Sequence, residues 1–214
     1  MLLLPNAMTI SPLIYDLGVI PYQDTLQRMQ KFTRERTEET PDELWLLEHP
    51  PVFTQGIAGK AEHILSPHHI PVVQTDRGGQ VTYHGPGQLV VYVLCHLKRQ
   101  QWTVRSFVCA LENTIMEYCR TLNIPTQCDS ERRGVFAEGK KICSIGLRIS
   151  QGASYHGIAL NINMDLTPFT YINPCGYSQL PMTQIKDFQP NIKLDNVKKE
   201  IIPYFLKNLR YNPH

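Results

Sequence analysis

The chain has 214 residues, of which 42% are hydrophobic and 19% are charged. This composition is typical of a folded globular domain and excludes a disordered or low-complexity protein. The formal net charge is only +2, and the basic residues are scattered, so we expect no binding of nucleic acid. A chain of this length can bury one sizeable core, so we expect a single domain over residues 1–214, with residues 1–12 as a loosely held N-terminal segment.

The N-terminus and the cysteines indicate a compartment. The first four residues are apolar but stop at Pro5, with no basic region before them and no small-residue cleavage site, so this is not a signal peptide. No stretch approaches the roughly twenty apolar residues that a membrane-spanning helix needs. The six cysteines form no C-x-x-C pair and are expected to be free thiols. We therefore expect a cytoplasmic protein that binds no membrane.

The first half of the chain alternates short apolar runs with loops. Residues 13–17 predict a strand, and Pro21 fits the first turn of a helix that turns Leu26, Met29 and Phe32 inward. Residues 43–47 and 71–74 predict two further strands, separated by proline and glycine signals. Residues 89–97 (LVVYVLCHL) are the most hydrophobic segment, which predicts a central strand buried on both faces.

The second half begins with the clearest helix. Its apolar residues recur at spacings of three and four, and they are Val104, Phe107, Val108, Leu111, Ile115, Tyr118, Cys119 and Leu122. The helix is expected to stop at residues 123–125. A last helix is predicted over residues 195–209, with Asp195 as its cap and a kink at Pro203.

Between these helices the apolar period changes to two. Residues 134–137, 141–149 and 153–163 predict successive strands, joined by turns at 138–139 and 151–152. Because the strands are grouped rather than alternating strictly with helices, the pattern predicts an α+β fold, with a mixed or antiparallel sheet flanked by helices.

A glycine-rich segment spans residues 77–88 (RGGQVTYHGPGQ). Its glycine density allows the backbone to approach a ligand closely, and a tight hairpin is an equally good interpretation. The segment matches neither G-x-G-x-x-G nor G-x-x-x-x-G-K-[ST], so it gives little support for nucleotide binding.

One cysteine is a candidate nucleophile. Cys175 lies in Asn-Pro-Cys-Gly, a turn that would expose its thiol, whereas Cys128 is undecided. The cysteines inside predicted helices or strands are expected to be small buried hydrophobic residues, and they are Cys95, Cys109, Cys119 and Cys143. The turn alone does not establish that Cys175 is catalytic.

A catalytic thiol needs a positioned base or cation. His84 and His156 each lie beside a glycine, so a Cys/His pair is possible, and the other histidines show no metal-ligand spacing. Lys141 is another candidate, because on a strand it would share an apolar face with Cys143, Ile145 and Leu147, and burial favours a neutral amine that can accept the thiol proton. On this pattern alone, however, a solvated hairpin lysine beside Lys140 is the better interpretation.

Four segments taken together resemble a known family: RGGQVTYHGPGQ (77–88), KICSIGLRI (141–149), SYHGIALNIN (154–163) and INPCG (172–176). In this combination and order they resemble the bacterial lipoyl(octanoyl) transferases. The resemblance implies an α+β fold shared with the catalytic domains of biotin and lipoate protein ligases, without their ATP chemistry. It also implies that Cys175 accepts the acyl group and that Lys141 is its general acid–base partner.

The resemblance further implies the acyl pocket and the partners. The substrate-binding residues would be Arg77, Gly78, Gly79, Gln80, Val81, Thr82, Tyr83, His84, Ser144, Ile145, Gly146, His156, Gly157, Ile158 and Ala159. Backbone N–H groups near Cys175 or in the Gly78–Gly79 turn could stabilise an oxyanion. The donor would be octanoyl-acyl carrier protein, and the acceptors would be lipoyl domains of 2-oxoacid dehydrogenase E2 subunits and the glycine cleavage H protein. The reaction would need no metal, nucleotide or redox cofactor.

Three other functions remain open at this point. An ATP-dependent lipoate or biotin protein ligase of the same fold would adenylate a free acid and would need no cysteine. An acyl-binding module would use the same pocket without chemistry. A cysteine hydrolase would pair Cys175 with His84 or His156, although no helix that would carry the nucleophile is predicted after Cys175.

Overall fold

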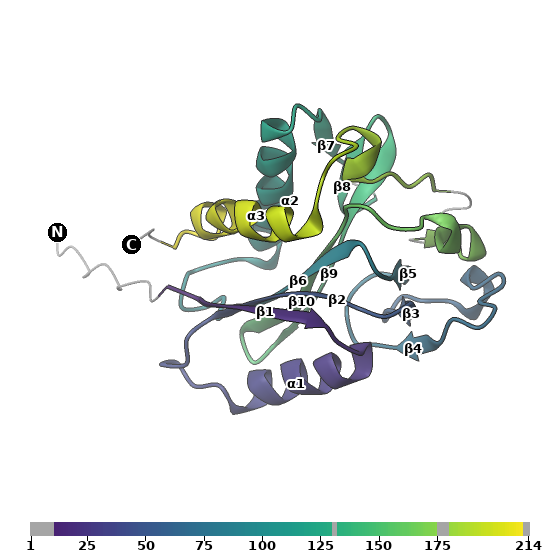
Figure 1. Cartoon of the computed structure of the whole chain (residues 1–214). Helices are drawn as coiled ribbons and strands as arrows, with labels where there is room; N and C mark the ends of the chain where they lie inside the picture. The colour runs from purple at the N-terminus through teal and green to yellow at the C-terminus, as the bar shows by residue number, and fades with distance from the viewer. Residues whose placement is uncertain (1–10, 130–131, 175–179, 212–214) are drawn as a thin grey trace.

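The computed structural model describes residues 11–129, 132–174 and 180–211. Its main sheet has seven strands in the order β1-β2-β6-β10-β9-β8-β7 (Figure 1). They are β1 (Leu13–Val19), β2 (Glu43–Glu48), β6 (Gln88–Leu94), β7 (Thr126–Cys128), β8 (Val135–Ala137), β9 (Lys140–Ser150) and β10 (Ala153–Asn161). Because β1 runs parallel to β2 while the other neighbours are antiparallel, the sheet is mixed. The predicted α+β fold is confirmed.

A smaller sheet lies beside the main one, in the order β4-β3-β5. Its strands are β3 (Val52–Gln55), β4 (Val72–Gln74) and β5 (Val81–His84). The prediction missed β3 and β5. The glycine-rich segment does turn at Gly79 and Gly87, where φ is positive, but the residues between the turns pair with β3 as a strand.

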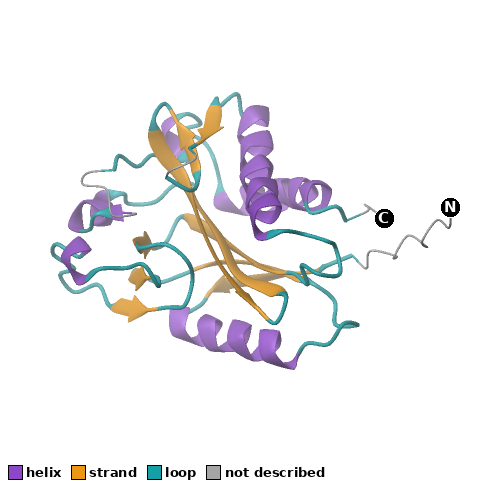
Figure 2. Ribbon diagram, turned by 180° about the vertical axis from the view of Figure 1, so that it is seen from behind, coloured by secondary structure: helices purple, strands orange, loops and turns teal. Residues whose placement is uncertain are grey.

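Helices cover both faces of the main sheet (Figure 2). One face packs against α1 (Tyr22–Glu35), and the other packs against α2 (Val104–Thr121) and α3 (Leu194–Asn208). Short 3₁₀ helices span Ala61–His63, Thr167–Tyr171 and Ile185–Asp187. Each face of the sheet therefore has its own apolar core.

The helix ends show where sequence signals succeeded and failed. Helix α2 begins with a capping box, in which Thr103 and Ser106 bond each other's backbone N–H groups. Val104, at its first position, is 52% exposed and lies outside the apolar stripe. The predicted cap at Asp195 is wrong, because α3 begins one residue earlier and Lys193 precedes it without a side-chain hydrogen bond.

The predicted central strand is confirmed. Every residue of β6 is buried, and β2 and β10 pair with its two edges. The neighbouring β9–β10 hairpin turns at Gln151–Gly152, as expected, with positive φ at both residues. Burial on both faces explains the unbroken apolar run, because neither face of this strand meets water.

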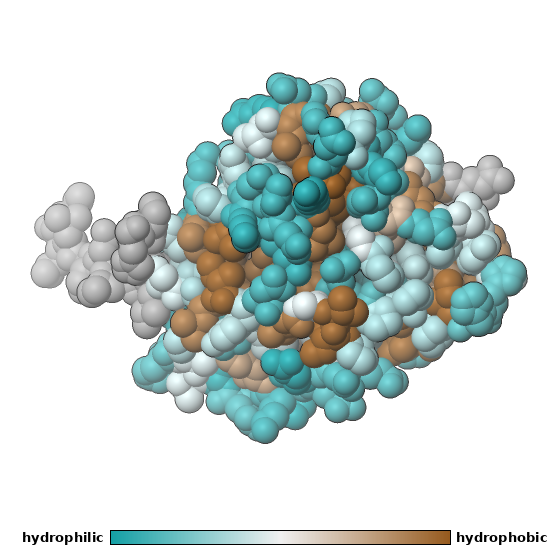
Figure 3. Space-filling model, viewed as in Figure 1, coloured by the Kyte–Doolittle hydropathy of each residue, from teal (hydrophilic) through white to brown (hydrophobic). Residues whose placement is uncertain are grey.

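The surface mixes apolar and polar side chains (Figure 3). β1 crosses the face that Figure 3 shows, and its exposed apolar residues are Leu13, Ile14, Tyr15 and Val19. In the part of the chain that the structure describes, every helix is too short or too polar to cross a bilayer.

Candidate functional site

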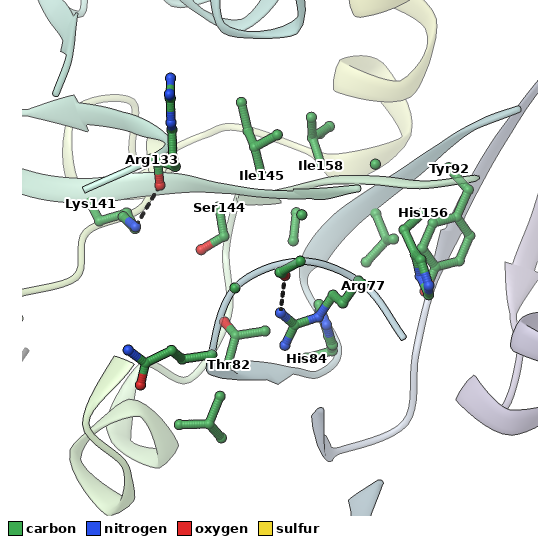
Figure 4. A pocket seen from close by; sticks show the side chains of 18 of the residues that line it. Arg77, Thr82, His84, Tyr92, Arg133, Lys141, Ser144, Ile145, His156 and Ile158 are labelled. Atoms are coloured by element: carbon green, nitrogen blue, oxygen red, sulfur yellow. Dashed lines mark hydrogen bonds between the residues drawn. The ribbon is translucent and has the colours of Figure 1, made fainter. Parts of the chain in front are cut away.

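One pocket collects residues from segments that are far apart in sequence (Figure 4). It is lined by the loop before β5, by β9 and by β10, with Lys141 and Arg133 toward one end and Tyr92 and His156 toward the other. All the substrate-binding residues expected from the resemblance line it, apart from Tyr83. The pocket is therefore the candidate site.

Tyr83 points away from this pocket. It is 4% exposed, and its ring lies 5.5 Å from the rings of Phe53 and Phe169 in a separate apolar cluster. Its strand neighbours Thr82 and His84 line the pocket, whereas the Tyr83 ring packs in this cluster. Tyr83 is absent from the pocket lining, and its role in binding substrate stays a prediction.

Glycines let the loop before β5 lie directly against β9. Gly78 N–H donates to the carbonyl oxygen of Leu147 at 2.8 Å. A Cβ on Gly146 would come within 3.1 Å of Arg77 Cδ and 3.3 Å of the Gly78 carbonyl oxygen. The absence of side chains here brings the loop backbone to the pocket wall, as expected from its glycine density.

Lys141 is completely buried, whereas Lys140 is exposed. Its Nζ donates to the carbonyl oxygen of Arg133 at 2.8 Å and lies 5.2 Å from the centre of the Phe136 ring. Cys143 belongs to the core under α2, with Ile145 and Leu147 packed against it, but Lys141 lies outside that cluster and reaches the pocket. The expected burial is confirmed, and the carbonyl contact supplies a polar partner that the sequence did not reveal.

A buried arginine, Arg77, lines the pocket. Arg77 is 8% exposed, and its guanidinium donates to the carbonyl oxygen of Thr54 at 2.6 Å and to Thr54 Oγ1 at 2.9 Å. Thr54 Oγ1 in turn lies 3.2 Å from His84 Nε2. Burial, with His49 and Arg77 nearby, holds the pKa of His84 well below its usual range. His84 is therefore neutral near pH 7.

A second buried histidine lies behind the pocket wall. His49 Nδ1 donates to the carbonyl oxygen of Ile20 at 2.7 Å, and its Nε2 accepts from Tyr92 Oη at 2.7 Å. Burial lowers the pKa of His49 to about 4. This pair was not predicted from the sequence. The available signal was Tyr92 itself, because a tyrosine hydroxyl in a strand buried on both faces needs a hydrogen-bond partner.

His156 has an unusual backbone for a strand residue. Its φ is 61°, a backbone conformation that residues other than glycine rarely adopt. Its Nε2 donates to Asp76 Oδ1 at 2.8 Å, and Tyr155 and Gln30 donate to Asp76 Oδ2. Burial opposes the charge on Asp76, but these hydrogen bonds outweigh it and hold its pKa below the usual range. The anion fixes the tautomer and orientation of His156 at the end of the pocket.

The cysteines divide into buried and exposed groups. Cys95, Cys119 and Cys143 are buried, as expected, and burial raises the pKa of each thiol. Cys109 is exposed, which corrects the expectation of a buried residue, because it lies on the outward face of α2. Cys128 is exposed as well, and partial burial with Glu112 nearby raises its pKa to about 11. Cys175, the candidate nucleophile, lies outside the described residues.

Four pocket-lining residues were not predicted from the sequence. They are Tyr22, Val90, Tyr92 and Arg133. They come from α1, from β6 and from the segment before β8, and their arrival at one place depends on the order of the strands in the sheet. No local sequence pattern carries that information.

Similar proteins of known sequence cover nearly the whole chain. The octanoyltransferase of Coxiella burnetii is 56% identical over 194 residues, which cover 91% of this chain and 80% of the relative. The octanoyltransferase of Yersinia pestis is 50% identical over 209 residues, which cover 98% of this chain and 90% of the relative. The resemblance to lipoyl(octanoyl) transferases is thereby confirmed.

Solved structures show the same fold at low sequence identity. A crystal structure of lipoate-protein ligase A bound with ATP has a TM-score of 0.79 at 16% identity, covering 96% of this chain and 88% of the other. The biotin protein ligase from Aquifex aeolicus, in complex with biotin and ATP, has a TM-score of 0.61 at 13% identity, covering 92% and 70%. Residues 21–206 match the family described as "Lipoyl protein ligase A/B catalytic domain". The chain therefore belongs to the family of lipoyl protein ligase A/B catalytic domains.

Proposed function

We propose that the chain is an octanoyltransferase, which moves an octanoyl group from octanoyl-acyl carrier protein to the lysine ε-amine of a lipoyl domain. Cys175 would carry the acyl group as a thioester, and Lys141 would act as general acid and base. The acceptors would be the lipoyl domains of 2-oxoacid dehydrogenase E2 subunits and the glycine cleavage H protein, in the cytoplasm.

The observation that carries this proposal is the buried amine of Lys141 at one end of a largely apolar pocket. An amine at this place can exchange protons with a neighbouring thiol and with a leaving group. Apolar and glycine residues of β9 and β10 form one wall of the pocket, which suits an alkyl chain; they are Ile145, Gly146, Gly157, Ile158 and Ala159.

In the first half-reaction, Lys141 takes the proton from the thiol of Cys175, and the thiolate attacks the carbonyl carbon of the octanoyl thioester. The new C–S bond to Cys175 forms as the C–S bond to the carrier's pantetheine thiol breaks. Lys141 returns its proton to that departing sulfur. One thioester replaces another, so this half-reaction is nearly balanced in free energy.

In the second half-reaction, the neutral ε-amine of the acceptor lysine attacks the octanoyl-Cys175 thioester. The C–N bond forms and the C–S bond to Cys175 breaks, while Lys141 moves a proton from the attacking nitrogen to the Cys175 sulfur. The product amide is more stable than the thioester, which drives the cycle forward. Backbone N–H groups near Cys175 or in the Gly78–Gly79 turn would stabilise the oxyanion of each step.

The test is intact-protein mass spectrometry after mixing with octanoyl-acyl carrier protein without ATP. The wild-type chain should gain one octanoyl group that hydroxylamine removes, and Cys175→Ala should gain none. Lys141→Ala should acylate at least about a hundredfold more slowly, because general acid–base catalysis commonly contributes that much. Lys140→Ala is the matched control, since Lys140 is exposed beside it, and it should react like the wild type.

The ATP-dependent ligase is the competing function, because the structural neighbours of this fold include ligases bound with ATP. A ligase would attach free octanoate to a lipoyl domain only when ATP is present. If the wild-type chain stays unmodified by the acyl-carrier donor and modifies the acceptor with octanoate and ATP, the transferase proposal is wrong.

A further inference from the structure

A chain of hydrogen bonds runs behind the candidate pocket, from its arginine to the segment beside Lys141. Its members are the side chains of Arg77, Thr54, His84, Gln88 and Asn161, and each is at most 8% exposed. Their links measure 2.9 Å (Arg77 Nη2 to Thr54 Oγ1), 3.2 Å (Thr54 Oγ1 to His84 Nε2), 2.7 Å (His84 Nδ1 to Gln88 Oε1) and 3.0 Å (Gln88 Nε2 to Asn161 Oδ1). Neither Gln88 nor Asn161 lines the pocket itself.

The directions of the hydrogen bonds made by the two amides are fixed by backbone carbonyl oxygens, which can only accept. Asn161 Nδ2 donates to the backbone carbonyl of Thr183 at 3.0 Å, so Asn161 Oδ1 must be the acceptor for Gln88. Gln88 Nε2 also donates to the carbonyl of Tyr83 at 3.2 Å, which leaves Gln88 Oε1 to accept from His84 Nδ1. The orientations of both amides follow from their surroundings.

The same reasoning fixes the histidine. Thr54 Oγ1 accepts from Arg77 Nε at 3.3 Å and from Nη2 at 2.9 Å, which uses both of its lone pairs. Its only proton therefore goes to His84 Nε2. His84 is the neutral tautomer with its hydrogen on Nδ1, and it passes hydrogen bonds onward without taking part in proton transfer.

This series of hydrogen bonds ends at the backbone segment that borders Lys141. Lys141 N–H donates to the carbonyl of Pro181 at 2.8 Å, and Thr183 N–H donates to the carbonyl of Lys141 at 3.0 Å. Residues 181–183 thus lie beside β9 at Lys141. They pair with it through one isolated bridge, between Lys141 and Met182, and do not form a strand. Asn161, the last residue of β10, donates to the Thr183 carbonyl oxygen and so ties this short segment to β10.

We propose that Gln88 and Asn161 are positioning residues for Lys141, which hold residues 181–183 against β9 and thereby set the place of the lysine amine in the pocket. This inference rests on the proposed acid–base function of Lys141. A single bridged residue pair allows more movement than a strand ladder, so the side-chain tether replaces the missing backbone hydrogen bonds. Each amide nitrogen must donate a hydrogen bond to an oxygen. A carboxylate of the same shape cannot donate, so it cannot replace either amide.

The experiment replaces each amide with its carboxylate. In Asn161→Asp, an oxygen faces the Thr183 carbonyl and the tether is lost. In Gln88→Glu, the acceptor for His84 remains, but an oxygen faces the Tyr83 carbonyl and Asn161 Oδ1. The matched controls are Asn163→Asp and Gln23→Glu, because both residues are exposed and neither side chain has a hydrogen bond among the described residues.

The probe is octanoyl-pantetheine, and the readout is single-turnover acylation of the enzyme followed by mass spectrometry over a range of probe concentrations. We expect both variants to acylate to full amplitude with an unchanged half-saturating concentration, because neither residue lines the pocket. Their maximal rate constants should fall about tenfold or more, the equivalent of one lost buried hydrogen bond. Both controls should keep the wild-type rate constant.

A purely structural role gives a different result. It would lower the amplitude, because fewer molecules are folded, but the folded remainder would react with the wild-type rate constant. That outcome, or a wild-type rate constant at full amplitude, overturns the positioning role even though the transferase function stands. If the wild-type chain is not acylated at all, the proposed function is wrong and this inference falls with it.

Discussion

At the scale of single residues, the site is built around neutral histidines. His49, His84 and His156 are buried, and burial is the largest cause that lowers the pKa of each. Each ring has a backbone or side-chain partner that fixes one tautomer. Hydrogen bonds occupy both ring nitrogens of His49 and of His84, so these two rings are held as neutral parts of the pocket wall.

The lowered pKa of His49 predicts a pH dependence of stability. As the pH falls below about 6.5, a histidine in the unfolded chain takes up a proton, whereas folded His49 stays neutral until about pH 4. The unfolded state then binds more protons than the folded state, so the free energy of unfolding falls as the pH falls through this window. His49→Asn should make this decline shallower by up to about 1.4 kcal/mol per pH unit.

The measurement is urea unfolding at a series of pH values between 7 and about 4. His69→Asn is the control, because His69 is exposed, and its curve should run parallel to that of the wild type. A His49→Asn curve that also runs parallel to the wild type would show that His49 takes up its proton over the same pH range in the folded and unfolded protein.

At the scale of elements, the pair β9–β10 organises the site. Gly146 on β9 pairs with Gly157 on β10, and both line the pocket. The two glycines nevertheless have different neighbours. A Cβ on Gly157 would lie 2.0 Å from the Val91 carbonyl oxygen of β6, while one on Gly146 would meet Arg77 Cδ at 3.1 Å. A side chain at position 157 would therefore collide with the sheet, and one at position 146 would press on the pocket wall.

The same substitution should therefore have different effects at the two positions. Gly157→Ala requires β6 to move, so we expect it to lower the free energy of unfolding by about 3 kcal/mol or more. Gly146→Ala requires only a small shift of the Arg77 side chain and loop, so it should cost less stability and instead raise the half-saturating concentration of octanoyl-pantetheine. Denaturant unfolding and single-turnover acylation measure the two effects. Equal stability losses would contradict this account.

The elements differ in how well the sequence predicts them. The β6 strand was predicted from an unbroken apolar run, which burial on both faces produces, and helix α2 from an apolar stripe at spacings of three and four. β5 was missed because its four residues lie between turn-forming glycines, and only pairing with β3 makes them a strand. β7 was missed because it has only three residues, of which two are exposed, so it carries no apolar period.

At the scale of the whole molecule, four motifs that are distant in sequence were expected to form one site. Three of them meet at the described pocket, and the fourth contains Cys175, which lies outside the described residues. Tyr92 and Arg133 reach the same pocket without a motif. Their convergence depends on the strand order β6-β10-β9-β8, which is a property of the complete fold that local patterns do not encode.

The C-terminal end of the described chain is attached by Tyr211 to Asp42, a buried residue that does not line the pocket. Asp42 is fully buried, between the guanidinium groups of Arg36 and Arg99, each at 2.6 Å. Tyr211 Oη donates to Asp42 Oδ2 at 2.6 Å and lies 3.2 Å from Cys95 Sγ. This hydrogen bond connects the segment after α3 to the residue before β2, so α3 is held over the sheet both by its apolar face and by Tyr211 beyond its end.

Tyr211→Phe tests whether this attachment serves stability alone. The substitution keeps the ring but removes a hydrogen bond to a buried charge, so the free energy of unfolding should fall by about 1.5–3 kcal/mol. Tyr15→Phe is the matched control, because Tyr15 is 40% exposed and its hydroxyl has no hydrogen bond among the described residues. The control should change stability by less than about 0.5 kcal/mol. Since Tyr211 does not line the pocket, the acylation rate constant of the folded Tyr211→Phe protein should equal that of the wild type, and a slower rate constant at unchanged stability would instead show that the end of the chain controls the site.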